Sequence, residues 1–491
     1  MPDFLIAFGI VAVVLTVASL VSGLVERAPI SFPILFLGLG FLVGEKGLGV
    51  LEMGPHDETL EIVATLTLAL VLFLDAVRLN VRDLGRRWLV PFLILGPGTA
   101  LIIVLGAVPL ALMLGFGWIL AFIGGAVLAS TDPVILRDVI RDRRIPQSVR
   151  QVLKIEAGMN DLVVLPVILV LIAVSLNEVG GTLGWLDFMA RLLLLGPAIG
   201  FAIGGLGSWL MSRVEKSVGA RREYQALYGV GLVLAAYTAA TAAGGDGFLG
   251  AFAAGAAVVL LNQTLCDCFL DYGEVTSEMA MLLAFVLFGS MLSGILSMAD
   301  LGLSLALAAL VIFGIRPLVL GAVLSTARMS WGARGFISWF GPRGLNSLLL
   351  ALIAVAAGVP GAEVLMATVG IVVLASAAIH GASTTPVALW YERRVSRETL
   401  EEERETTAAG LFAHEEDTVH RIGPGELKQR MDEGKPTVVL DVRSRSGYEA
   451  DPSHIPGSVR VLPDEALDWA HARNQDAEAT DERPLIATYC A

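Results

Sequence analysis

Ionisable side chains occur at seven positions inside stretches of sequence that are otherwise apolar: Asp75, Asp132, Glu156, Asp161, Arg191, Arg316 and Arg343. Each costs at least about 2.5–3.5 kcal/mol to place in a lipid bilayer, so each needs a partner or a function. A carboxylate held away from water is neutralised by a proton, by a metal cation or by a basic side chain. Competition between a proton and a cation for one such carboxylate is the chemistry that these acids can support.

The segment Ala129-Ser130-Thr131-Asp132-Pro133 interrupts one of these apolar stretches. Proline lacks a backbone N–H and disfavours helical geometry in the residue before it. The sequence therefore predicts a break at Asp132 between two half-helices, whose ends would carry partial charges inside the membrane. The alternative is a simple proline kink in which Asp132 caps the second half-helix. The two interpretations are compatible, because Asp132 can act as a cap at a functional break.

Two acids and an amide follow in the next apolar stretch, as Glu156, Asn160 and Asp161. On an α-helix Glu156 and Asn160 share one face, whereas Asp161 lies about 140° around the helix from Glu156. One carboxylate can therefore face a water-filled cavity while the other faces a neighbouring helix. Neutralisation of both acids within the helix packing is the alternative.

A second interruption, Gly341-Pro342-Arg343-Gly344, lies in the other half of the chain. Two interrupted spans in different halves are typical of inverted repeats with an ion site between them. Arginine keeps its charge in a membrane, so we expect Arg343 to balance a buried acid, with Glu156 as its partner. Arg316, beside Pro317, is a candidate for a similar task. Arg191 lies near the end of a span, where its side chain can reach water, and receives no role.

The composition identifies the elements that must carry these residues. The 491 residues are 55% hydrophobic and 16% charged, with a mean hydropathy of +0.73. This excludes a soluble multidomain enzyme, a disordered chain and a disulfide-rich secreted protein. Because about 20 apolar residues cross a bilayer, we expect an all-α polytopic membrane protein with thirteen spans, near 4–25, 30–44, 59–79, 89–115, 117–140, 148–176, 184–212, 222–243, 247–263, 274–297, 301–325, 333–358 and 363–390.

Basic residues between the spans predict the orientation. Sixteen Lys or Arg, from Arg27 to Arg334, fall in the connections on one side, against Lys46 alone on the other. Since cytoplasmic loops are enriched in basic residues, we expect the amino terminus outside and the carboxyl terminus in the cytoplasm of a bacterial inner (plasma) membrane.

The chain beyond the last span has a different composition. Residues 391–491 contain 22 Asp or Glu and 13 Lys or Arg. We expect a transmembrane domain over 1–390, a charged linker over 391–417, and a small water-soluble α/β domain over 418–491 with a helix near 424–433 and strands near 437–443 and 485–490. The charge pattern gives no indication of nucleic-acid binding. The three cysteines, Cys266, Cys268 and Cys490, are too few for a disulfide framework.

The motifs of the body together resemble the monovalent cation/proton antiporter family of prokaryotic Na⁺/H⁺ exchangers, over residues 5–390. The matching segments are Thr131-Asp132-Pro133, Glu156, Asn160-Asp161, Phe248–Phe252 with Gly255, Arg316-Pro317 and Gly341–Gly344. Asn160-Asp161, in place of two adjacent aspartates, resembles the subclass associated with electroneutral exchange. The resemblance implies a 1:1 antiporter of Na⁺ or Li⁺ against H⁺, acting as a homodimer in the lipid bilayer, with no cofactor beyond the transported ions.

The resemblance also implies roles for single residues. Asp161 would bind the cation or the proton in turn, with Na⁺ held between it and Thr131 in the unwound crossover that contains Asp132. Glu156 would pair structurally with Arg343. Asp75 falls where members often have a glutamate near the ion path.

One departure from the family pattern affects the expected cation. Ala157 stands where a ligating serine is common, so the preference for Na⁺ over K⁺ is open. The alternatives are a K⁺/H⁺ antiporter regulated by its tail, a membrane-anchored sulfurtransferase, and a channel.

The tail resembles a rhodanese domain. The matching segments are Asp441-Val442-Arg443, Glu449, His454–Val459 and the strand that ends at Cys490. Cys490 would occupy the position of the persulfide-forming cysteine, but the given sequence ends at Ala491, before the loop that would surround the thiol. We therefore expect a regulatory module in this chain and no sulfurtransferase activity.

Overall fold

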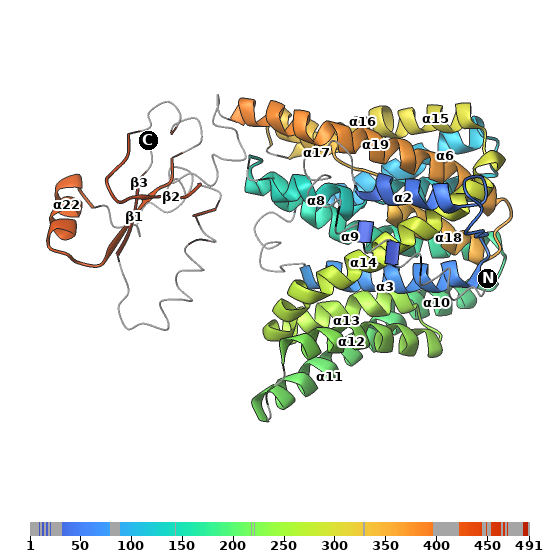
Figure 1. Cartoon of the computed structure of the whole chain (residues 1–491), viewed down its shortest axis with the longest axis horizontal. Helices are drawn as coiled ribbons and strands as arrows, with labels where there is room; N and C mark the ends of the chain where they lie inside the picture. The colour runs from blue at the N-terminus through green and yellow to red at the C-terminus, as the bar shows by residue number, and fades with distance from the viewer. Residues whose placement is uncertain are drawn as a thin grey trace. The chain divides into compact units, whose positions relative to one another are not determined.

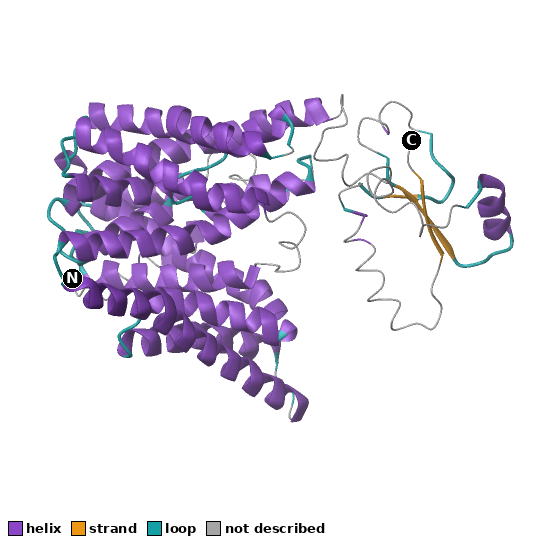
Figure 2. Cartoon of the chain, turned by 180° about the vertical axis from the view of Figure 1, so that it is seen from behind, coloured by secondary structure: helices purple, strands orange, loops and turns teal. Residues whose placement is uncertain are grey.

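The computed structural model describes residues 32–78, 89–142, 144–217, 221–327, 329–395, 422–443, 453–462 and 485–489, together with a few isolated positions. Helices make up nearly all of the body, and the strands occur in the C-terminal tail (Figure 2). The predicted fold class, a polytopic helical membrane protein with a small α/β tail, is confirmed. The chain divides into two compact units, and the one formed by residues 1–137, 154–323 and 338–384 contains every predicted membrane site residue.

The helices of the body follow the predicted spans. They are α2 (Phe32–Val43), α3 (Glu58–Arg78), α5 (Leu89–Leu93), η1 (Ile94–Gly98), α6 (Thr99–Leu112), α7 (Trp118–Ala129), α8 (Pro133–Arg141), α9 (Gln147–Ser175), α10 (Gly181–Ala190), η2 (Arg191–Leu195), α11 (Gly196–Ser217), α12 (Arg222–Ala242), α13 (Gly247–Leu261), α14 (Gln263–Ile295), η3 (Leu296–Met298), α15 (Leu301–Ala309), η4 (Leu310–Ile315), α16 (Arg316–Val323), η5 (Leu324–Thr326), α17 (Trp331–Trp339), α18 (Leu345–Ala356) and α19 (Ala362–Val395).

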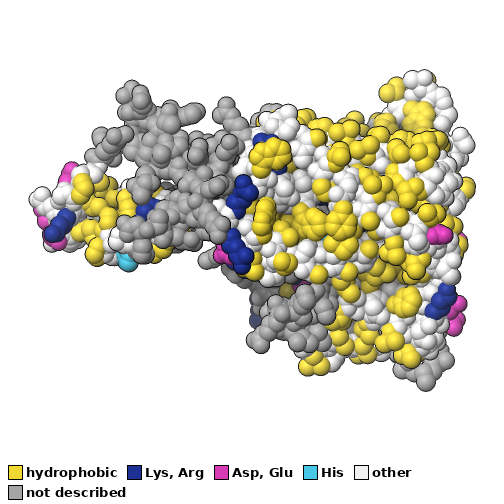
Figure 3. Space-filling view, turned by 90° about the horizontal axis from the view of Figure 1, so that it is seen from above, with side chains coloured by type: hydrophobic (Ala, Val, Ile, Leu, Met, Phe, Trp, Pro, Cys, Tyr) yellow, Lys and Arg dark blue, Asp and Glu magenta, His cyan; other side chains and the backbone are white. Residues whose placement is uncertain are grey.

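Eight helical stretches among the described residues are long and apolar enough to cross a membrane, and four shorter ones are also apolar. The first predicted span, near 4–25, lies outside the described residues except for isolated positions. Hydrophobic side chains cover much of the helical face seen in Figure 3. Exposed Leu and Phe residues of the body include Leu105 and Phe313. An apolar outer surface of this kind suits a bilayer and would be costly in water.

Two predicted spans are interrupted, as the sequence indicates. Residues 130–132 are non-helical between α7 and α8, and residues 340–344 are non-helical between α17 and α18. Pro133 begins α8, where its missing N–H costs nothing, and Gly344 precedes α18. The local sequence therefore fixes where each helix stops and restarts.

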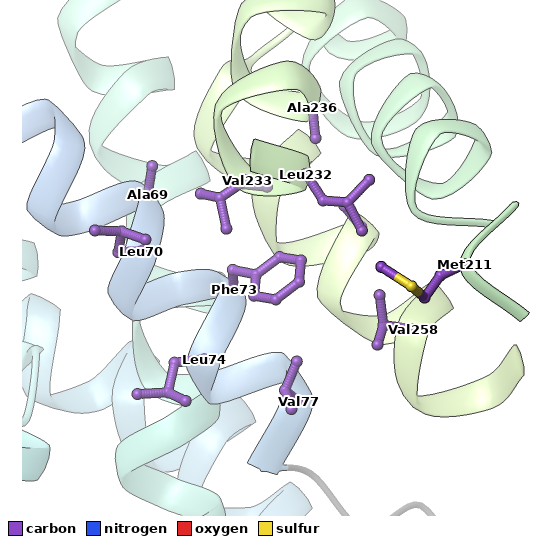
Figure 4. Packing of buried hydrophobic residues seen from close by; sticks show 12 residues of the cluster. Ala69, Leu70, Phe73, Leu74, Val77, Met211, Leu232, Val233, Ala236 and Val258 are labelled. Atoms are coloured by element: carbon purple, nitrogen blue, oxygen red, sulfur yellow. The ribbon is translucent and has the colours of Figure 1, made fainter. Parts of the chain in front are cut away.

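Helix α3 is held by an apolar cluster on one of its faces. Phe73, Leu70 and Val77 of this face pack against Leu232 and Val233 of α12 (Figure 4). Asp75 is two residues from Phe73, and residues two apart on a helix point to nearly opposite sides. The packing of α3 thus turns Asp75 away from the cluster.

Small residues bring α11 and α13 into close contact. A methyl group on Gly200 would overlap the backbone of Gly250, and one on Gly204 would overlap that of Ala254. Close packing of backbones through small residues is a common way to join helices in lipid, where no hydrophobic effect drives them together. Helices α12 and α13 contact α3, and α11 packs on α12 and α13 (Figure 1), so the three helices together form the layer that holds α3 in place.

The tail contains the helix α22 (Pro424–Asp432) and a parallel three-stranded sheet. Its strands are β1 (Thr437–Asp441), β2 (Val459–Arg460) and β3 (Leu485–Tyr489), in the order β2-β1-β3. The predicted helix and two predicted strands are confirmed, whereas the short β2 was not predicted.

A buried ion pair stabilises the end of β1. Arg443 donates from Nη2 to Asp441 Oδ2 at 2.6 Å and from Nε to Oδ1 at 2.9 Å, with both side chains at most 5% exposed. Burial raises the pKa of Asp441, but the hydrogen bonds from Arg443 outweigh it and bring the pKa to about 2. The carboxylate is therefore charged at neutral pH and depends on its arginine.

Replacing Arg443 by alanine should destabilise the tail by up to about 3–5 kcal/mol, because Asp441 would lose its two short hydrogen bonds and keep only the longer ion pair with Arg460, at 3.6 Å. The measurement is the urea concentration at which the tail of the full-length, detergent-solubilised protein becomes susceptible to limited proteolysis. Lys435→Ala is the control, since it removes only the exposed pair with Glu433. Equal susceptibility of the two variants would contradict the prediction.

Candidate ion-binding site

The two interrupted helices contact each other at Asp132. Its backbone N–H donates to the Pro342 carbonyl at 2.9 Å. Its carboxylate accepts from the N–H of Val134 at 2.7 Å and from the N–H of Leu345 at 2.6 Å. One side chain therefore caps both α8 and α18. Gly344 makes this approach possible, because a methyl group there would overlap the Asp132 carboxylate.

Arg343 caps the end of α7. Its Nη1 donates to the carbonyls of Ala129 at 3.1 Å and Ser130 at 2.7 Å, and lies 3.3 Å from Thr131 Oγ1. The C-terminal end of a helix carries unsatisfied carbonyls and a partial negative charge, so a buried cation is stabilising there. The backbone N–H of Arg343 donates to Ser376 Oγ of α19 at 2.8 Å. The second interruption is thus fixed to both α7 and α19.

Glu156 pairs with Arg316. Arg316 Nη1 lies 2.6 Å from Glu156 Oε1, and Nη2 donates to the Phe340 carbonyl at 2.8 Å. Both side chains are buried. The predicted pairing of Glu156 with Arg343 is therefore wrong, because the guanidinium of Arg343 is directed to the carbonyls at the end of α7. The alternative candidate, Arg316, supplies the counter-charge.

Asp161 is buried without a basic partner among the described residues. It is 1% exposed. Ser130 Oγ donates to its Oδ1 at 2.6 Å, and Asn346 Nδ2 donates to its Oδ2. Ser130 comes from the first interruption and Asn346 from the start of α18. The carboxylate therefore lies where the half-helix ends meet, and the described residues that hydrogen-bond to it are neutral.

Sequence reasoning did not assign these two neutral donors. Ser130 belongs to the motif that predicted the first break, but no contact to Asp161 followed from the motif. Asn346 is a polar residue three positions after Arg343, at the start of an apolar half-helix. A buried amide beside a predicted break is a signal that could have identified it.

Three other predicted residues lie around Asp161 in different ways. Asp75 is 3% exposed, with Oδ1 3.9 Å from Arg78 Nη1, and its Oδ2 has no partner among the described residues. Asn160 is also buried, and its Oδ1 likewise lacks a partner in the described part of the chain. The hydroxyl of Thr131 instead lies against Arg343 and 3.5 Å from Glu156 Oε1. Its side chain therefore lies between Arg343 and Glu156.

Comparison with known proteins supports the same function class. The family model described as the transmembrane sodium/hydrogen exchanger matches residues 12–390. The chain belongs to the sodium/hydrogen exchanger family. A rhodanese-like domain model matches residues 423–491. This exchanger is therefore a transporter of monovalent cations and protons that carries a rhodanese-like tail. Cys490, the predicted thiol position of the tail, lies outside the described residues.

Relatives of this exchanger include proteins named as antiporters. It is 27% identical over 400 residues to the K(+)/H(+) antiporter NhaP of Alkalimonas amylolytica, which covers 80% of this chain and 68% of that one. It is 29% identical over 389 residues to the K(+)/H(+) antiporter NhaP2 of Shewanella sp. strain ANA-3, covering 78% and 66%. The chain thus spans about two thirds of the length of these relatives.

A solved structure shares the fold. The sodium proton antiporter MjNhaP1 of Methanocaldococcus jannaschii superposes with a TM-score of 0.66 at 18% identity, covering 79% of this chain and 99% of that one. The arrangement of the helices is therefore that of the exchanger fold.

A double-mutant cycle should distinguish the two arginines near Glu156. Arg316→Gln leaves Glu156 buried and unpaired, so it should lower stability by roughly 3–5 kcal/mol, and adding Glu156→Gln should restore much of the loss. Arg343→Gln should also destabilise, but adding Glu156→Gln should not rescue it. Thermal unfolding of the purified protein in detergent measures both cycles. Rescue of Arg343→Gln together with no rescue of Arg316→Gln would contradict the assignment.

Proposed function

We propose that this exchanger moves one monovalent cation against one proton across the membrane, with Asp161 as the group that binds each in turn. The observation that carries the proposal is the environment of the buried acids. Glu156 has Arg316 as its counter-ion, and the Asp132 carboxylate is occupied by two backbone N–H groups. Asp161 has only a hydroxyl and an amide.

The neutral partners of Asp161 suit an exchange reaction. Ser130 and Asn346 donate hydrogen bonds that stabilise the charged carboxylate. A hydroxyl and a carboxamide each also carry an acceptor oxygen, so the same side chains can face a bound cation after rotation. A permanent basic partner would hold the carboxylate in one state. Its absence among the described residues leaves Asp161 free to exchange a cation for a proton.

A stoichiometry of one to one follows from the charges. Asn160 is neutral, so Asp161 contributes the single titrating charge of the Asn-Asp pair. A carboxylate that carries either one monovalent cation or one proton is neutral in both loaded states. Movement of the loaded site then transfers no net charge, and exchange is electroneutral.

K⁺ is the cation that we propose first. The curated relatives at 27–29% identity are named as K(+)/H(+) antiporters, and Ala157 provides no hydroxyl ligand where the family pattern often does. Na⁺ or Li⁺ is the second candidate, because the solved structure of the same fold is named as a sodium proton antiporter.

The remaining assignments concern the cellular context. We propose that the protein acts as a homodimer in the bacterial plasma membrane, with the amino terminus outside and the rhodanese-like tail in the cytoplasm. The distribution of basic residues supports this orientation. For the tail we propose regulation of transport, and the assay for the alternative is thiosulfate:cyanide sulfur transfer by the full-length protein.

Asp161→Asn should abolish cation-driven proton movement, because an amide binds neither ion in exchange. The measurement is dequenching of a pH-sensitive dye in proteoliposomes on addition of K⁺, Na⁺ or Li⁺ in turn, with gel filtration to check folding. Asp187→Asn is the matched control, because Asp187 is an exposed residue of α10 that pairs with Arg191. Flux through folded Asp161→Asn equal to that of the control would refute the proposal.

An imposed membrane potential separates exchange from channel conduction. The turnover of an electroneutral exchanger should stay the same when a potential of either sign is applied across the proteoliposome membrane. A channel would instead conduct in the direction of the potential without proton coupling. Cation flux that rises severalfold with the potential would contradict the one-to-one mechanism.

A further inference from the structure

Gly158 is a buried glycine on α9 that packing does not require. Other buried glycines lie so close to a neighbouring helix that a methyl group would overlap its backbone, as at Gly125 and Gly255. At Gly158 the nearest atoms to such a methyl would be Asp75 Cβ at 3.8 Å, Asp75 O at 3.9 Å and Asp75 Cγ at 4.0 Å. These are ordinary van der Waals distances. The residue is also helical, with a negative φ, so its backbone does not demand glycine.

The space beside Gly158 adjoins the ion site. Gly158 and Asp161 are three residues apart on α9, and side chains at this spacing are neighbours on one helix face. Asp75 approaches the same face from α3. One oxygen of this acid, Asp75 Oδ2, has no hydrogen-bond partner among the described residues. The hydrogen of Gly158 therefore leaves room for one methyl group beside Asp75, on the face of α9 that also carries Asp161.

We propose that Gly158 determines the cation specificity of this exchanger, by leaving the space between Asp75 and Asp161 wide enough for K⁺. The inference rests on the proposed function, in which Asp161 binds the transported ion. To that function it adds a residue, Gly158, that sets the size of the ion site.

Ion size provides the physical reason. K⁺ is larger than Na⁺ or Li⁺ and keeps its oxygen ligands farther apart, so a site that fits K⁺ needs more volume between them. A methyl group at position 158 fits against Asp75 without displacing it, and so reduces this volume while the carboxylates stay in place. The smaller ions should tolerate the reduction better than K⁺.

Gly158→Ala tests the proposal. The half-saturation concentrations for K⁺, Na⁺ and Li⁺ are measured separately in proteoliposomes for wild type and variant. One added methyl group in a fitted site discriminates by about tenfold or more, so the ratio of the K⁺ to the Na⁺ value should rise by about tenfold. The control is Gly231→Ala on α12, where the methyl group would meet no atom within 4 Å. Its ratio should equal that of wild type.

A second variant tests the same space with a substitution on α3 in place of α9. Asp75→Glu lengthens the acid that faces Gly158, fills the same space from α3, and should shift the ratio in the same direction. An unchanged ratio in both variants would overturn the proposal, as would equal losses for all three ions or a wild-type preference for Na⁺ or Li⁺. Absence of any cation-driven proton flux in wild type would instead overturn the proposed function.

Discussion

The contact between two broken helices inside an apolar body is the interaction on which the rest of the structure depends. Asp132 joins them, since its N–H bonds to Pro342 and its carboxylate caps both α8 and α18. Four half-helix ends meet there, and each brings backbone groups that lipid cannot satisfy. Asp132 satisfies donors on two of these ends, and Arg343 satisfies carbonyls at the end of α7.

The assignment of the two buried arginines explains why Asp161 can be an exchange site. A guanidinium within reach of Asp161 would neutralise it permanently. Arg343 is occupied by the carbonyls of α7, and Arg316 by Glu156 and the Phe340 carbonyl. Both buried arginines therefore already have partners other than Asp161, namely Glu156 for Arg316 and the carbonyls of α7 for Arg343. Within the described part of the chain, Asp161, the proposed ion-binding carboxylate, has hydrogen bonds only from the neutral groups of Ser130 and Asn346.

Glycines serve different purposes in this fold. Gly200 allows α11 to pack closely on α13, and so supports the layer that holds α3 and Asp75. Gly344 allows Asp132 to reach the start of α18. Gly158 differs from both, because a methyl group there would meet Asp75 only at van der Waals distances of 3.8–4.0 Å. The same residue type thus provides close helix packing and access to a helix cap, and at Gly158 we propose that it provides room for the ion.

The sequence by itself determined the spans and the breaks, because both follow from local chemistry. Apolar stretches of sufficient length form helices in lipid, and Pro133 or the Gly341–Gly344 segment interrupts them wherever the chain lies. The sequence also identified which acids are buried. Only the tertiary structure decided their partners: Glu156 lies 160 residues from Arg316 and 187 from Arg343 along the chain. Sequence spacing cannot choose between two arginines that far away. The folded arrangement of the broken segments brings Arg316 to the Glu156 carboxylate and Arg343 to the carbonyls at the end of α7. The contacts of Ser130 and Asn346 with Asp161 depend on the same crossing.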